Sequence, residues 1–183
     1  MEFEEHPGRP WKIAPDRMTD AQRALVRHVE GGPRGRMPPN LTIWLNNMGF
    51  APVAEKFGEY VSQIATFTPR QKEIVILTVA AFWQSRFEWH FHQALGAKRG
   101  LTQQQIDAIW QGTDPGFTDP VERASWELVR ALLAHDVPDE VHRRTMEKLG
   151  HQGVQDIIGL MGLYTMIAQT IAYYRVPIPK ATE

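Results

Sequence analysis

The fold is decided by residues 68–83, which read TPRQKEIVILTVAAFW. Thr68 supplies a hydroxyl that can cap a helix, Pro69 suits the first helical position, and Gln71 stands third, as in a capping box. The residues that follow are apolar on nearly all sides, which is typical of a helix in the centre of a domain. Their β-branched side chains also permit a buried strand. The good cap, and the helical patterns on both sides, favour a helix.

The rest of the chain shows helical periodicity around this central segment. Apolar residues recur at three- and four-residue spacing, and capping residues, glycine or proline mark the ends of the segments. We found no long alternating segment and no internal repeat. The sequence therefore predicts an all-α fold. The expected helices span residues 21–30, 41–48, 53–66, 69–83, 86–98, 103–110, 120–135, 139–149 and 152–174. The third of these should bury one face, formed by Val53, Phe57, Tyr60, Val61 and Ile64.

The chain has a length that suits one domain. We expect residues 1–30 to form an N-terminal arm and a first helix, and residues 31–183 to form the main helical domain. Residues 1–17 contain three prolines and a glycine, which predict an extended arm on the surface or on a neighbouring subunit. Residues 31–40 predict a loop, either a plain connector or a cover for a site.

Composition excludes several classes of function. The chain has 20 Lys and Arg residues against 21 Asp and Glu residues, so its charge gives no support to nucleic acid or an anionic membrane as a partner. It has no cysteine, which excludes disulfides and thiol catalysis. The longest apolar run, residues 74–83, is shorter than the roughly 20 residues that span a membrane. The acidic N-terminus does not look like a secretory signal, so we expect a cytoplasmic location.

The best candidates for chemistry are Glu88 and His92, which lie one helical turn apart on the same face. A carboxylate beside an imidazole orients the ring and raises its basicity, which suits proton transfer. An ordinary surface pair would show the same spacing. His90 points about 200° away from His92 on a helix, so we expect no shared metal ion. No phosphate-binding loop or dinucleotide fingerprint is present, so we expect no cofactor.

A family resemblance adds to this interpretation. Residues 69–77 read PRQKEIVIL, and residues 88–102 read EWHFHQALGAKRGLT. Together they resemble the carboxymuconolactone decarboxylase family within the alkyl hydroperoxidase D-like superfamily. That family has a Glu-bearing helix, a short break, a Glu-Trp-x-x-His or Cys-x-x-Cys-x-x-x-His segment, and then Gly-Leu-Thr or Gly-Leu-Ser. The resemblance extends over roughly residues 30–180, through the GLY of residues 162–164 and the VPIP of residues 176–179.

The resemblance implies specific roles for some residues. Glu73 matches the family's helix glutamate, and His92 matches its motif histidine. The two peroxidase cysteines fall on Ser85 and Glu88, so the chain resembles the cysteine-free, decarboxylase branch. On one unbroken helix, Glu73 and His92 would lie roughly 28 Å apart. The resemblance therefore implies a break at Gln84 and Ser85, or a contact between subunits. It also implies a homo-oligomer, a trimer or a hexamer, which the broadly apolar segment 157–171 supports.

These features predict a cofactor-independent lyase that acts on a small carboxylated lactone or unsaturated acid. His92 would move the proton, Glu88 would orient it, and Glu73 would share in the relay. For substrate binding we expect Trp89, Ser85 and Arg34, whose guanidinium could bind a carboxylate. Aromatic residues at this spacing also fit a core. An isomerase, a hydratase or a hydrolase on the same scaffold remains an alternative, as does a non-catalytic oligomeric binding module. A buried Glu73–His92 contact beside a cavity would favour an enzyme.

Overall fold

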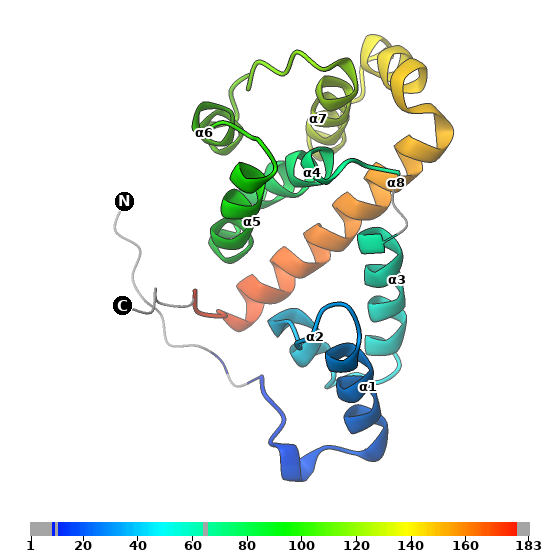
Figure 1. Cartoon of the computed structure of the whole chain (residues 1–183), viewed down its shortest axis with the longest axis vertical. Helices are drawn as coiled ribbons and strands as arrows, with labels where there is room; N and C mark the ends of the chain where they lie inside the picture. The colour runs from blue at the N-terminus through cyan, green and yellow to red at the C-terminus, as the bar shows by residue number, and fades with distance from the viewer. Residues whose placement is uncertain (1–8, 10, 64–65, 179–183) are drawn as a thin grey trace.

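A computed structural model shows a helical protein (Figure 1). It describes residues 9, 11–63 and 66–178. No strand occurs among these residues, and the predicted all-α fold class is confirmed. The elements are the 3₁₀ turn η1 (Pro15–Arg17) and the helices α1 (Asp20–Gly31), α2 (Pro39–Trp44), α3 (Ala51–Gln63), α4 (Pro69–Phe82), α5 (Arg86–Lys98), α6 (Gln103–Gln111), α7 (Pro120–Leu133) and α8 (Asp139–Tyr174).

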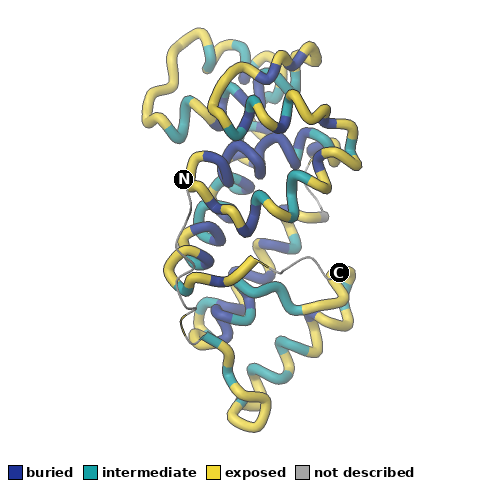
Figure 2. The backbone as a smooth tube through the Cα atoms, turned by 90° about the vertical axis from the view of Figure 1, so that its left-hand side faces the viewer, coloured by how far each residue is buried: buried dark blue, intermediate teal, exposed yellow. Residues whose placement is uncertain are grey.

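Helix α4 lies in the centre of the molecule, as its sequence predicts. It packs against α5, α6, α7 and α8, and the residues from Glu73 to Ala81 are all buried. Figure 2 shows the buried stretches gathered in the interior and the exposed turns at the two ends of the molecule. Residues of α1, α2, α3, α4, α7 and α8 share one hydrophobic core, and a second cluster joins α4 to α6 and α7. Glu73, the one acidic residue of α4, is therefore placed deep inside a largely apolar helix.

Helix α8 crosses the molecule and supports both halves of it (Figure 1). It contacts α2, α3, α4 and α7, so the chain itself covers much of the apolar surface that we expected a partner subunit to cover. Gly150 interrupts the helix with a φ of 64°, close to the predicted end of the segment 139–149. Among the described residues, α8 alone is long and apolar enough to cross a membrane. This is weak evidence for a membrane span, because the core helix of a globular protein passes the same test of length and composition.

The predicted capping residues start the helices. Thr19 and Thr102 form full capping boxes with the glutamines three residues later, and the Asp119 side chain accepts hydrogen bonds at the start of α7. Thr68 accepts the backbone N–H of Gln71, but the Gln71 side chain does not complete a capping box. It donates instead to the hydroxyl of Ser125 at 2.8 Å, which fastens α4 to α7.

The N-terminal arm lies on its own chain. Arg9 donates its backbone N–H to the carbonyl of Tyr174, and the side chain of Asn46 donates to the carbonyl of Trp11. Residues 15–17 form a 3₁₀ turn, so that part of the arm is not extended as predicted. Residues 1–8 and 10, which the prediction also included, lie outside the described residues.

The predicted buried face of α3 is wrong in part. Val53 is 67% exposed, Phe57 is 38% exposed and Tyr60 is 39% exposed, whereas Ala54 and Glu55 are buried. The reason is that Glu55 pairs with Arg34 inside the fold, which turns the helix so that the larger apolar side chains face outward. Val61 is buried as predicted, and Ile64 lies outside the described residues.

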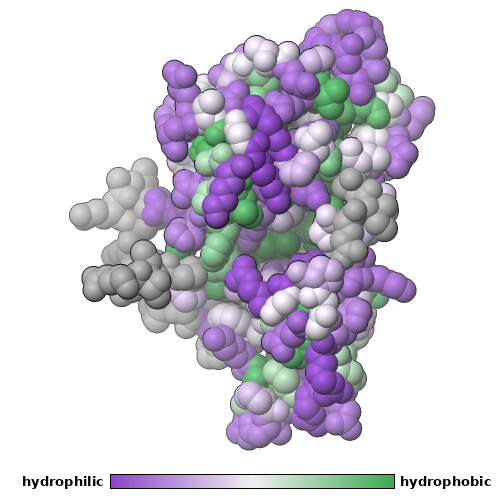
Figure 3. Space-filling model, viewed as in Figure 1, coloured by the Kyte–Doolittle hydropathy of each residue, from purple (hydrophilic) through white to green (hydrophobic). Residues whose placement is uncertain are grey.

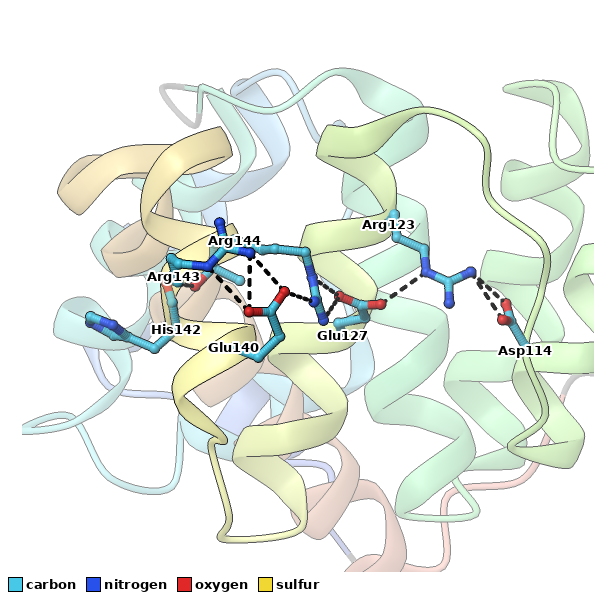
Figure 4. A network of polar contacts seen from close by, with 8 residues as sticks. Asp114, Arg123, Glu127, Glu140, His142, Arg143 and Arg144 are labelled. Carbon is cyan, nitrogen blue, oxygen red and sulfur yellow. Dashed lines mark hydrogen bonds and ion pairs between the residues drawn. The ribbon is translucent and has the colours of Figure 1, made fainter.

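A line of ion pairs ties α7 to the first part of α8 (Figure 4). Glu127 binds Arg123 of its own helix and Arg144 of α8, each with an N–O distance of 2.9 Å. Arg123 also binds Asp114 in the loop before α7, and Arg144 binds Glu140. We call these five residues the charged ladder. It holds the loop, α7 and α8 in register at the surface.

Candidate functional site

The site depends on a sharp turn between α4 and α5. The chain leaves α4 at Phe82, and Gln84 adopts a left-handed conformation with a φ of 51°. The backbone N–H of Ser85 then bonds the carbonyl of Ala80 at 2.8 Å. This is the predicted break at Gln84 and Ser85. It folds α5 back along α4, so that residues 19 positions apart meet within one chain.

Gly96 allows the two helices to approach closely. A Cβ atom at this position would lie 2.9 Å from Cδ1 of Leu101, 3.2 Å from Cδ1 of Leu77 and 3.8 Å from Cβ of Glu73. The first two distances are too short for an unshifted contact. The absence of a side chain at Gly96 therefore sets how near α5 lies to the central glutamate.

Glu73 and His92 form the centre of the site. Glu73 is only 1% exposed, and its Oε2 lies 2.7 Å from Nδ1 of His92. Arg99 donates to the other carboxylate oxygen of Glu73. Since Glu73 accepts on both oxygens, Nδ1 of His92 is the donor. This contact orients the ring and leaves Nε2 on the opposite side for chemistry.

Two further groups face the free nitrogen of His92. The hydroxyl of Tyr164, on α8, lies 3.3 Å from Nε2, and the two rings meet edge to face. Oε2 of Glu88 lies 3.6 Å from the same nitrogen, beyond hydrogen-bond length. The short contact to His92 is therefore made by Glu73, and the carboxyl one turn away on the same helix is a looser neighbour. We call Glu73, Glu88, His92, Arg99 and Tyr164 the His92 cluster.

Burial controls the protonation of this cluster. Burial raises the pKa of Glu88, and the nearby His92 opposes that shift. The hydroxyl end of Tyr164 is buried, although the residue as a whole is partly exposed, and desolvation raises the pKa of its phenol well above the ordinary range. Glu88 and Glu73 raise the pKa of this phenol further, because nearby carboxylates disfavour a phenolate. Tyr164 therefore remains a neutral hydrogen-bond donor.

Ser85 presents an unused hydroxyl at the start of α5. The residue is buried, and its Oγ has no hydrogen-bond partner among the described residues. It stands at the N-cap position but does not cap the helix with its side chain. A buried hydroxyl without a partner is costly.

Arg34 lies on the α8 side of the site and is already paired. Its Nε is 3.4 Å from Oε1 of Glu55, a carboxyl that is buried in α3. Gly58 leaves room for the guanidinium, because a Cβ there would lie 2.8 Å from Nη2. The charge of Arg34 reaches Tyr164, where it opposes the rise of the phenol's pKa.

Trp89 takes a different place from the one we expected. Its ring packs against Trp110 of α6, with centroids 4.6 Å apart, in the second hydrophobic cluster. Among the described residues, no hydrogen bond or ring contact joins Trp89 to the residues of the His92 cluster. The ring thus fastens α5 to α6, as the core interpretation of these aromatic residues predicts. Among the described residues, no three His, Asp or Glu side chains are grouped so that they could hold a metal ion.

Sequence reasoning missed Arg99 and Tyr164. Each lies far from its partner along the chain: 26 residues separate Arg99 from Glu73, and 72 separate Tyr164 from His92. No local spacing links them. The one available signal was the hydroxyl of Tyr164 in the mostly apolar second part of α8, because buried phenols require a partner.

Comparisons with known proteins agree with this fold. Residues 51–131 match the model of the carboxymuconolactone decarboxylase family. Among curated proteins, none matches the sequence of this chain. A peroxidase-related protein from Ralstonia eutropha, with an alkylhydroperoxidase AhpD core, has 14% identity and a TM-score of 0.73, covering 96% of this chain and 94% of that chain.

Two further solved structures are similar. A peroxidase-related protein from Silicibacter sp. has 11% identity and a TM-score of 0.72, covering 92% of this chain and 88% of its own. The debrominase Bmp8, solved in complex with 2,3,4-tribromopyrrole, has 11% identity and a TM-score of 0.71, covering 93% of this chain and 91% of its own. At these identities the likeness concerns the fold.

The matched segment contains the greater part of the site. Residues 51–131 include α4 and α5 and therefore carry Glu73, Glu88, His92 and Arg99, whereas Tyr164 comes from α8 outside the match. The described chain thus has the fold of the alkyl hydroperoxidase D-like structures without any cysteine, and its residues 51–131 match the model of the carboxymuconolactone decarboxylase family.

Proposed function

We propose that this protein is a cofactor-independent lyase, active in the cytoplasm, that decarboxylates a small carboxylated lactone or a similar unsaturated acid. The observation that carries the proposal is the fixed His92 ring. Its Nδ1 is held by the buried Glu73 at 2.7 Å, and its Nε2 faces Tyr164 and Glu88. The family match and a debrominase of the same fold support a scaffold for small-molecule enzymes.

The distances favour a different division of roles from the one that the sequence predicts. Glu73, with Arg99 on its second oxygen, orients His92 and stabilises the imidazolium. Glu88 sits beside the reactive nitrogen, and burial favours its neutral form. A neutral carboxyl does not repel an anionic substrate. It can also donate a hydrogen bond, as the phenol of Tyr164 can.

In the proposed reaction, the substrate carboxylate leaves as carbon dioxide, and the electron pair of the broken carbon–carbon bond moves into the conjugated lactone carbonyl. The resulting dienolate takes a proton on carbon from Nε2 of the His92 imidazolium. Water then returns a proton to His92, so one proton is consumed for each carbon dioxide released. The hydroxyls of Tyr164 and Ser85 and the carboxyl of Glu88 supply donors for the enolate oxygen.

The substrate reaches His92 from the side of α8. The His92 side chain is largely buried, with 13% of its surface exposed. Figure 3 shows apolar atoms recessed between the α4–α7 group and the α1–α3 group, on the face where α8 crosses. Arg34, whose charge acts on Tyr164, is the proposed partner of a substrate carboxylate, in competition with Glu55. We propose that a neighbouring subunit of a homo-trimer or homo-hexamer closes this entrance.

To test the proposal, the protein is incubated with carboxymuconolactone in D₂O, and the release of carbon dioxide and the deuterium on the product carbon are measured. His92→Gln should reduce kcat by roughly 10²–10⁴-fold, the usual contribution of a general acid–base group. His90→Gln is the matched control, since His90 is exposed and packs edge-on against Phe91. Damage from His90→Gln with a silent His92→Gln would refute the assignment. Absence of carbon dioxide release by the native protein would refute decarboxylation of this acid.

A further inference from the structure

A second site lies outside the His92 cluster. A cleft of about 360 Å³ opens between α4, α6 and α7, and none of its lining residues belongs to that cluster. Clefts of roughly 300–1,000 Å³ are the size that holds small molecules. The walls are mostly apolar, with three aromatic rings and one charged side chain: Phe82, Ile109, Trp110, Trp126, Leu133 and Arg130. We call this the Trp126 cleft.

Two arginines lie near the Trp126 ring, and they differ in one respect. The guanidinium of Arg123 is 5.6 Å from the ring centroid and is neutralised by Asp114 and Glu127 of the charged ladder. The guanidinium of Arg130 is 5.2 Å from the centroid, and no carboxylate pairs with it among the described residues. The charge at the cleft is therefore uncompensated, which favours an anion.

Arg130 is held in place without being neutralised. Its Nη1 donates to the carbonyl of Gly112, the residue that ends α6 in a left-handed conformation. This contact fixes the guanidinium over the cleft and leaves its other N–H groups for a ligand. A fixed arginine fork matches the two oxygens of a carboxylate.

The remaining lining favours a flat, unsaturated body. The rings of Trp110 and Trp126 both line the cleft, and neither indole N–H has a hydrogen-bond partner in the described part of the chain. Aromatic surfaces bind planar rings by stacking or edge contacts. We propose that the Trp126 cleft binds a planar unsaturated monocarboxylate, with its carboxylate on Arg130 and its ring against Trp110 and Trp126. One charge in the lining matches one carboxylate.

Calorimetric titration with 2-naphthoate, and with its neutral analogue 2-naphthamide, tests this site in the full chain. The native protein should bind the acid more tightly than the amide. Arg130→Gln should weaken 2-naphthoate about tenfold or more and leave 2-naphthamide nearly unchanged, because a charge-assisted bidentate contact is lost. Arg143→Gln removes the same charge from α8 and should have no effect. His92→Gln should also leave the affinity unchanged.

A second variant keeps the test decisive if Arg130→Gln does not fold. Ala134 lines the cleft at the end of α7, so Ala134→Phe should fill the space and abolish binding without altering Arg130. In amide spectra, 2-naphthoate should shift the indole signals of Trp110 and Trp126. Loss of affinity in His92→Gln but not in Arg130→Gln would place the acid in the His92 cluster and overturn the proposal. So would a native protein that does not bind the acid.

Discussion

The His92 cluster and the charged ladder are both networks of carboxylates and cations, but they differ in how fully their groups are paired. In the ladder, Glu127 binds two arginines; its own side chain is 15% exposed, and the other four members are more exposed. In the cluster, Glu73 is paired on both oxygens, whereas Oε2 of Glu88 stands 3.6 Å from Nε2 of His92, and the hydroxyl of Ser85 on the same helix has no hydrogen-bond partner among the described residues. Exposed charges tolerate imperfect pairing because water completes it, whereas buried ones do not.

This difference in pairing corresponds to a difference in role between the two networks. Saturated pairs can hold helices together, but they have no free atom to offer a substrate. In the cluster, some buried polar atoms remain without a full set of hydrogen bonds, which lowers the stability of the folded protein. We therefore expect substitutions in the cluster to have large effects that depend on pH, and substitutions in the ladder to have small effects that depend on salt.

The largest effect on stability should come from Glu73→Ala. It removes a buried charge that both His92 and Arg99 need, so the free energy of unfolding should fall by about 3–5 kcal/mol. Glu73→Gln keeps the size and one acceptor and should lose less. Urea unfolding of both variants measures this. If both remain within about 1 kcal/mol of the native protein, the comparison of the two networks fails.

A pH-dependent effect should follow from Glu88→Gln. Burial raises the pKa of Glu88 above its usual 4.5, so the folded protein keeps this proton to higher pH than the unfolded chain. Above about pH 4.5 the unfolded state therefore binds fewer protons, and this group makes stability fall as the pH rises.

Glu88→Gln abolishes that titration. The variant should thus gain stability relative to the native protein as the pH rises from about 4.5 toward 8, and the difference should be smallest in acid. Denaturant unfolding at several pH values measures the trend. The opposite trend would show that Glu88 is ionised and stabilising in the folded protein.

The smallest effect should come from the ladder. Glu127→Gln breaks its ion pairs with Arg123 and Arg144, whose guanidinium groups are partly open to water, and pairs near the surface contribute about 0–1 kcal/mol. The loss should shrink in 1 M salt, where the screening length is about 3 Å. Thermal unfolding at low and high salt measures both points. A loss as large as that of Glu73→Ala would erase the distinction between the networks.

Local chemistry predicted the helices better than the site. Thr19, Thr68, Thr102 and Asp119 start helices where expected, since a cap depends on residues within one turn. The predicted buried face of α3 was wrong in part. The ion pair between Glu55 and Arg34 joins residues 21 positions apart and overrides the local apolar pattern. Hydrophobic spacing cannot reveal such a pairing.

The candidate site shows the same limit. The i,i+4 spacing correctly predicted that Glu88 and His92 lie on one helix face. The shorter contact of His92, however, is to Glu73 on another helix. Family resemblance, and not periodicity, pointed to that residue. Tyr164 and Arg99 required the folded chain, since their contacts depend on how three helices cross.

The close approach at Gly96 has a consequence for how this protein tolerates variation. A methyl group there would press on the terminal methyl groups of Leu101 and Leu77, and wherever these side chains cannot turn aside, α5 would shift and carry the His92 ring away from Glu73. Alanine at this position fits the helix itself and favours its formation. A mutational scan that selects for activity should therefore mark Gly96 as intolerant, although it touches no substrate, while one that selects for expression should penalise it far less. Positions at which the activity scan and the expression scan disagree in this way would be residues that set the spacing of a site without being part of it.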